Sequence, residues 1–133
     1  MKQDLDTITG IIIDAAIKVH RVLGPGLLES VYMKALAIEL RKRGLKVEVE
    51  VPIRAEWEGE DIGIGFRADM LVEDRVLVEG KAVEQTTRLF LRQLRSQVRL
   101  SKRRVGLLLN FGMELMKDGI VRHVEGFDDE GQL

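Results

Sequence analysis

The sequence predicts an α/β fold, in which a central sheet is flanked by helices on both faces. Apolar residues recur at three- and four-residue steps near the start of the chain and again after residue 84, whereas they alternate or form short runs elsewhere. The expected order is two helices, about three strands, a helix and two strands, which packs as a sheet covered by helices. With 133 residues, 45% of them hydrophobic, we expect one domain spanning residues 1–133.

The helix boundaries follow from capping and breaking residues. Thr7 or Asp4 is suited to cap the first helix, and Gly24-Pro25-Gly26 separates it from the second. Gly44 is a suitable stop for the second helix. The expected helices cover residues 5–23, about 27–43 and 84–102.

The strands are indicated by alternation and by turn residues. Val47, Val49 and Val51 alternate with charged residues and are expected on one face of a strand. A turn over residues 58–61 follows, and Asp74-Arg75 is expected at the tip of a hairpin. The expected strands cover residues 46–52 with an extension to 57, 62–73, 76–83, 105–110 and 120–124.

Composition excludes several kinds of site. The absence of cysteine excludes disulfides and thiolate metal ligands, and two histidines are too few for a histidine-rich zinc site. Any metal is therefore expected to be hard and bound through carboxylates. No apolar run approaches the ~18–20 residues needed to span a membrane, and the polar start lacks an apolar signal core. We therefore expect a cytoplasmic protein without a membrane partner.

Glu29 is the first polar residue found where an apolar one is expected. At about 100° per residue, Glu29 lies on the same face of the second helix as Tyr32, Leu36 and Leu40. A glutamate is therefore expected at the N-terminal end of the face that the helix buries. It also lies in the first turn, where the helix dipole favours an anion. The alternative is an ordinary acidic first turn at the rim of the core.

Asp69, Glu79 and Lys81 interrupt two strand-like segments in the same way. Because side chains alternate along a strand, Glu79 and Lys81 point to the same side, about 7 Å apart. Asp69 joins them if Val72 pairs with Val76 across a three-residue turn, which places Asp69 opposite Glu79. A two-residue turn would place Asp69 on the other face; the sequence leaves both registers open, and the chemistry favours the first.

These three charged residues suit either an ion pair or a metal site. An ion pair of Lys81 with Asp69 or Glu79 explains two charges but leaves one acid unpaired. Two close carboxylates repel unless a cation is present, and Mg²⁺ prefers oxygen ligands completed by water. The sequence thus predicts Mg²⁺ bound by Asp69, Glu79 and the backbone carbonyl of Gly80, with Mn²⁺ as a substitute.

The motifs resemble those of a known protein family. Gly26-Leu27-Leu28-Glu29-Ser30-Val31-Tyr32 matches the signature of the GxxExxY proteins, and the resemblance extends over about residues 11–112. That family is placed in the PD-(D/E)XK nuclease superfamily, which implies a restriction-endonuclease-like αβββαβ core with a mixed central sheet flanked by helices. Further segments follow the family's order: Val19-His20, Leu23-Gly24-Pro25-Gly26, Arg67-Ala68-Asp69, Glu79-Gly80-Lys81, Gln93 and Gly106–Gly112.

The resemblance also implies roles for individual residues. Glu29 becomes the helix-borne acid, Asp69 and Glu79 metal ligands, and Lys81 the catalytic lysine. Gln93 matches a glutamine that often follows on the next helix. The sequence departs from the family pattern at three positions, and none of these departures removes a proposed ligand. Gly80 stands in place of an aliphatic residue, Gln97 in place of a tyrosine, and Phe90 in place of a histidine. The last two concern contacts with the phosphate and the choice of substrate.

The function implied is Mg²⁺-dependent hydrolysis of phosphodiester bonds, with Gln93 orienting Lys81 or the phosphate. Nucleic acid is the expected partner, DNA favoured over RNA, and a homodimer is compatible with the sequence. The alternative is a catalytically silent nucleic-acid-binding or scaffold module on the same fold. The stripe of arginines on the last helix is expected to face solvent, away from Gln93; it comprises Arg88, Arg92, Arg95 and Arg99, followed by Lys102.

Overall fold

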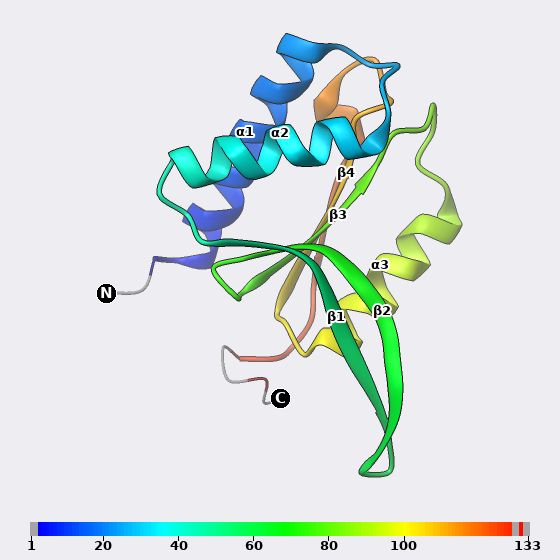
Figure 1. The fold of residues 1–133 in the computed structure, drawn as a ribbon. Helices are drawn as coiled ribbons and strands as arrows, with labels where there is room; N and C mark the ends of the chain where they lie inside the picture. The colour runs from blue at the N-terminus through cyan, green and yellow to red at the C-terminus, as the bar shows by residue number, and fades with distance from the viewer. Residues whose placement is uncertain (1–2, 129–130, 132–133) are drawn as a thin grey trace.

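Three helices pack around one five-stranded sheet (Figure 1). The computed structural model describes residues 3–128 and 131. The predicted order of elements is confirmed, with one added 3₁₀ helix before the last strand. The elements are α1 (Leu5–Leu23), α2 (Glu29–Lys42), β1 (Val47–Trp57), β2 (Glu60–Val72), β3 (Val76–Lys81), α3 (Arg88–Ser101), β4 (Val105–Asn110), η1 (Met116–Gly119) and β5 (Ile120–Val124).

The sheet is mixed and its strands follow one another in sequence order. β3 and β4 are parallel, whereas the other three pairs are antiparallel. A parallel pair needs a long crossover, and the segment that contains α3 supplies it. α1 and α2 cover one face and α3 the other (Figure 1), so the predicted fold class is confirmed.

Capping residues explain where the helices begin and end. Of the two predicted caps of α1, Asp4 is the one used, and its carboxylate accepts a hydrogen bond from Asp6 N at 3.3 Å. Gly44 adopts a φ of 88° just after α2 and so ends it as predicted. The prediction that the last helix begins at residue 84 is wrong, because Thr87 caps it by accepting a bond from Phe90 N at 3.3 Å.

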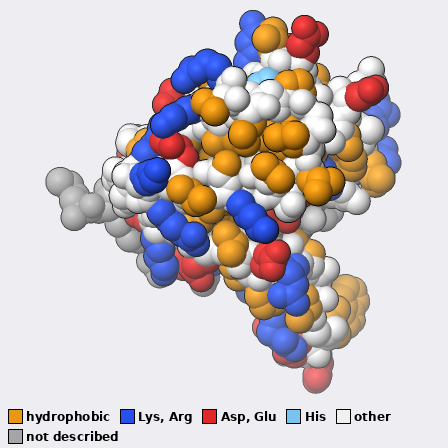
Figure 2. Space-filling model, turned by 45° about the horizontal axis from the view of Figure 1, so that its top comes forward, with side chains coloured by type: hydrophobic (Ala, Val, Ile, Leu, Met, Phe, Trp, Pro, Cys, Tyr) orange, Lys and Arg blue, Asp and Glu red, His pale blue; other side chains and the backbone are white. Residues whose placement is uncertain are grey.

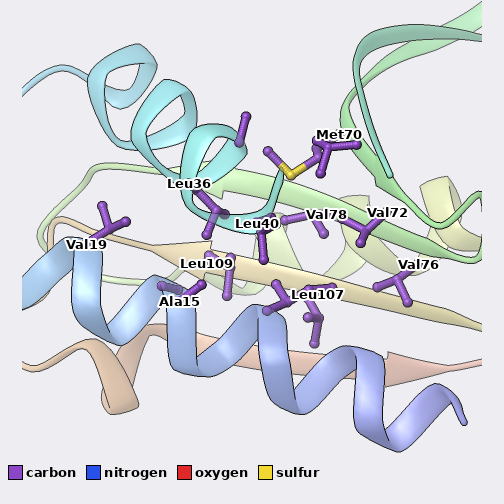
Figure 3. Close-up of a cluster of buried hydrophobic side chains, with 14 of the residues drawn as sticks. Ala15, Val19, Leu36, Leu40, Met70, Val72, Val76, Val78, Leu107 and Leu109 are labelled. Atoms are coloured by element: carbon purple, nitrogen blue, oxygen red, sulfur yellow. The ribbon is translucent and has the colours of Figure 1, made fainter. Parts of the chain in front are cut away.

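Each face of the sheet has its own hydrophobic core. Val72, Val76, Val78 and Leu107 pack beneath α1 and α2 (Figure 3), while Leu77 lies on the opposite face. The smaller core against α3 consists of Ala68, Leu71, Leu77, Leu94, Val98 and Leu108. None of the helices in the described part of the chain has the length and hydropathy needed to cross a lipid bilayer.

The alternation of β1 is broken at Glu50, so Val47 and Val51 do not share a face as predicted. Val47 belongs to the core beneath α2, whereas Val51 packs against the core beneath α3. Glu50, between them, has a φ of 51°, a left-handed conformation that reverses the direction of the following side chains. Asp69 lies across from this break, because the flanking pairs are Val49 with Met70 and Val51 with Ala68.

Beyond the break, β1 and β2 leave the sheet as a projecting two-stranded arm (Figure 1). Its tip is the turn at Glu58 and Gly59, both of which have positive φ as a tight hairpin requires. The catalytic candidates therefore lie at the base of the arm, where the sheet changes from five strands to two.

Candidate active site

The structure brings four predicted residues together from three elements. Glu29 is the first residue of α2, Asp69 lies in β2, and Glu79 and Lys81 lie in β3. The carboxyls of Glu29 and Glu79 both lie within hydrogen-bonding range of Asp69, and both interact electrostatically with Lys81. Asp69 is thus the centre of the group, with one acid on each side.

The strand register is the one that the three-residue turn requires. Val72 pairs with Val76, Leu71 with Leu77 and Met70 with Val78. The turn contains Glu73 and Asp74 with φ values of 54° and 53°. The next position along β2 is therefore Asp69, on the same side as Glu79.

Side-chain hydrogen bonds continue the link between β2 and β3 at the acids. Asp69 N donates to Glu79 Oε1 at 3.3 Å, and Gly80 N donates to Asp69 Oδ2 at 2.8 Å. The last backbone pair of these strands is Met70 with Val78. Each acid is therefore held by the main chain of the opposite strand, at the point where regular pairing ends.

Burial makes Glu79 hard to ionise. The residue is only 7% exposed, and burial together with the Asp69 carboxylate raises the pKa of Glu79 from 4.5 to about 8. Burial also raises the pKa of Glu29, with a smaller contribution from Asp69, while Lys81 acts in the opposite direction. The site thus holds three carboxyl groups beside one lysine, and burial disfavours the ionised form of two of them.

Lys81 lies beside the acids without forming a salt bridge to any of them, within the described residues. Its ammonium lies 4.5 Å from the centroid of the Phe90 ring, on α3. The electrostatic interactions with Glu29 and Glu79 act at longer range. A simple structural ion pair therefore does not account for this lysine.

A depression of about 520 Å³ opens on the α3 side of Lys81. Gln93 and Gln97 line it, as the helical spacing predicts, and so does Arg92. The prediction that the whole arginine stripe faces away from Gln93 is thus wrong for Arg92, which lies next to Gln93 at the edge of the helix. Arg88, Arg95 and Arg99, together with Arg92, line a separate depression against β5.

A sequence profile of the PD-(D/E)XK nuclease superfamily matches residues 6–123. The chain belongs to the PD-(D/E)XK nuclease superfamily. No curated protein and no solved structure matches the chain significantly. Membership indicates a nuclease-type function, a nucleic-acid substrate and the use of divalent metal ions, which is typical of PD-(D/E)XK nucleases.

The acids of this candidate site fit a hard divalent ion. No group of three or more histidine, cysteine or acidic side chains is arranged around a common point in the described residues. Mg²⁺ does not need such a cage, because it is usually bound through one or two carboxylates and retains water. Asp69 and Glu79 supply two carboxyls in mutual contact, which is the number of carboxylates that such a site needs.

Gly80 is accommodated by a neighbouring methionine. A Cβ at this position would lie 2.4 Å from Met33 Sδ and 2.8 Å from Met33 Cγ. The side chain of Met33, on α2, therefore occupies the space that an aliphatic residue at position 80 would need. The glycine at position 80 therefore makes room on the α2 side of β3, opposite the side that carries Glu79 and Lys81.

Two supporting residues lie within the sequence motifs, but the sequence assigned no role to either of them. The hydroxyl of Tyr32 donates to Gly24 O at 2.5 Å and accepts from Leu27 N at 3.0 Å, and its ring stacks on Phe111 with centroids 4.8 Å apart. These bonds shape the loop that leads to Glu29. The signal available in the sequence was a buried tyrosine on the same helical stripe as Glu29.

Asn110 supports the opposite side of the site. It is fully buried, and its Oδ1 accepts from Val83 N and Gly112 N, each at 3.1 Å. Its Nδ2 donates to Thr86 Oγ1 at 3.1 Å. Asn110 therefore ties down the loop between Lys81 and α3. A polar residue ending the buried run of β4 was the available signal.

Proposed function

We propose that this chain is a metal-dependent phosphodiester hydrolase of the GxxExxY group that acts on nucleic acid. The observation that supports it best is the contact of Asp69 with Glu79, with Lys81 two residues further along the same strand. Two carboxyls held this close, one of them buried, are unfavourable in a purely structural role. They are suited to binding a cation and a phosphate beside it.

Asp69, Glu79 and the backbone carbonyl of Gly80 would hold Mg²⁺, or Mn²⁺ in its place. The chemistry supplied by the bound ion is polarisation of the phosphoryl group and a lowered pKa of water. Deprotonated carboxylates are required for this binding, and the proton held by Glu79 near neutral pH has to leave first.

Lys81 would act on the reacting phosphate. Its ammonium is oriented by the ring of Phe90 and lies on the same side of β3 as Glu79. From there it stabilises negative charge that develops as water attacks phosphorus and the P–O bond to the leaving group breaks. Glu29 would hold an outer water molecule, and Gln93, which shares the depression with Lys81, would orient Lys81 or a phosphate oxygen.

The test is a cleavage assay with labelled single-stranded, duplex and structured DNA and RNA in the presence of Mn²⁺. We expect cleavage of at least one substrate, loss of cleavage in Asp69→Ala, and unchanged cleavage in Asp118→Ala, which removes an exposed carboxylate in η1. Isothermal titration should show that only Asp69→Ala loses Mn²⁺ binding.

Binding of metal and nucleic acid without turnover would instead support the catalytically silent module. The preference for DNA over RNA stays a prediction that the same panel tests. Light scattering of the purified protein would test the predicted compatibility with a homodimer.

A further inference from the structure

A second hollow opens on the other side of the acid group, between α2 and β1. It has a volume of about 560 Å³, and Glu29 and Asp69 form one end of it. Its remaining wall is mostly apolar and contains Met33, Ala37, Ile38, Val49 and Met70. We call this hollow the α2–β1 cavity. It adjoins the proposed metal ligands and faces away from the Lys81 depression.

Two features already described produce the α2–β1 cavity. The left-handed Glu50 ends the normal alternation of β1, so Val49 stays on the α2 side while the rest of the arm turns away. Gly80 lets Met33 lie directly over β3, where it forms part of the cavity wall. The cavity thus results from the same break and the same glycine that shape the active site.

Charged side chains of both signs line the cavity beside its apolar surface, because Glu50 joins the two acids at its end. Lys34 and Arg41 both line it, and within residues 3–128 neither forms a salt bridge with an acid. Arg41 is held in place by a hydrogen bond from its Nη2 to Val47 O at 2.9 Å. Figure 2 shows hydrophobic and basic side chains intermingled between the helical layer and the base of the arm. Apolar walls with basic residues beside them complement a nucleobase and its phosphates.

The recessed acids restrict which nucleic acids can reach them. Glu79 is 7% exposed, so a scissile phosphate has to enter the fold rather than rest on its surface. A base in a regular duplex is stacked and paired, and removing it costs a few kcal/mol, whereas an unpaired base is free to turn aside. Entry of a phosphate beside Asp69 would bring the adjoining base to the mouth of the α2–β1 cavity.

Resting on the proposed hydrolase function, we propose that the substrate is single-stranded or locally unpaired nucleic acid, with one nucleobase next to the scissile phosphate held in the α2–β1 cavity. Apolar side chains sandwich the base, and Lys34 and Arg41 contact the phosphates that flank it. The strand then continues past Asp69 toward the Lys81 depression. The surface of the cavity wall is mostly apolar, although Ser30, Lys34, Arg41 and Glu50 also line it, so we expect apolar contacts to dominate and sequence preference to be weak.

Binding is measured by fluorescence anisotropy with Mn²⁺ in a Lys81→Met background, in which the probe is not cut. The probes are a labelled single-stranded DNA, its duplex, and a series in which one base at a time is removed. We expect the single strand to bind at least tenfold more tightly than the duplex. One abasic position should weaken binding by about tenfold, as the loss of a single held base does.

Filling the cavity provides the decisive comparison. Val49→Trp places a large side chain in the cavity from a strand position that is 48% exposed, and Ile64→Trp is the matched control, at 52% exposed on the projecting arm. Val49→Trp should weaken single-strand binding by about tenfold and remove the effect of the abasic position, while Ile64→Trp should do neither. If Val49→Trp misfolds, Ile38→Glu, at a 55% exposed position of α2, should give the same loss.

Several results would overturn this inference. These are equal or tighter binding of the duplex, an abasic series without a sensitive position, or unchanged binding in the cavity variants. In the last two cases, an apolar segment of a protein partner becomes the better occupant. Cleavage by wild type with duplex preference would refute the substrate class but keep the hydrolase proposal. Single-strand binding with the abasic signature, but no cleavage by wild type, would refute the hydrolase and keep the binding inference.

Discussion

The two hollows that flank the acid group differ in lining and in origin. The α2–β1 cavity is mostly apolar and has the acids at one end, whereas the α3 side contains Lys81, Arg92 and two glutamines. The first owes its shape to contacts between α2 and β1, and the second to α3 and β2. One cluster of charged residues therefore faces two environments, one suited to a base and one to a phosphodiester backbone. This difference indicates a direction for a bound strand.

The strongest test of this comparison removes the charge on the α3 side. Lys81→Met keeps much of the stem and should abolish cleavage, because a single donor of this kind is typically worth ~10²–10³ in rate. Mn²⁺ affinity should stay equal or rise slightly, since a nearby cation is lost. Calorimetric titration and a cleavage time course measure the two effects. Cleavage at the wild-type rate would make Lys81 a structural residue.

The second test acts on the buried acid through pH. Because the folded pKa of Glu79, about 8, exceeds its ordinary value of 4.5, the folded state binds the proton more strongly. Its contribution to stability is therefore present below pH 4.5 and is lost as pH rises toward 8. Glu79→Gln cannot ionise, so its melting temperature without metal should exceed that of wild type by several degrees at pH 8, and the difference should shrink toward pH 4.

Thermal unfolding across this pH range, with and without Mn²⁺, measures the effect. Mn²⁺ should stabilise wild type at pH 8 and have little effect on Glu79→Gln. Glu29→Gln serves as a comparison and should show a smaller change in the same direction, since Glu29 is less buried. Parallel stability curves for wild type and Glu79→Gln would contradict a raised pKa of Glu79.

The smallest expected effect separates two arginines of one helix. Arg92 lines the depression with Lys81, whereas Arg95 lines only the one against β5. Arg92→Gln should weaken binding of single-stranded DNA a few-fold. The slope of log K against log salt concentration should become shallower by the amount expected for the loss of about one phosphate contact. Arg95→Gln should leave both unchanged. Equal effects would mean that the stripe acts as a general basic surface.

Local signals in the sequence were sufficient for the elements and for the acids. Periodicity and caps located the three α-helices and the five strands but not η1, and the polar interruptions at Glu29, Asp69 and Glu79 identified residues that do lie together. The errors came from local backbone features that periodicity does not show, and from one contact between distant segments. The start of α3 depends on Thr87 and on Asn110, 23 residues later, and the face of Val51 depends on the backbone at Glu50.

The sequence by itself determined the order of elements, the superfamily and which charged residues make up the candidate site, because these depend on residue type and spacing along the chain. Only the tertiary structure decided the strand register, the raised pKa of Glu79 and the two hollows. Burial and cavities arise where segments far apart in the sequence pack together. Met33 over Gly80, and Val49 beside Met70, are contacts of this kind, and no spacing along the chain encodes them.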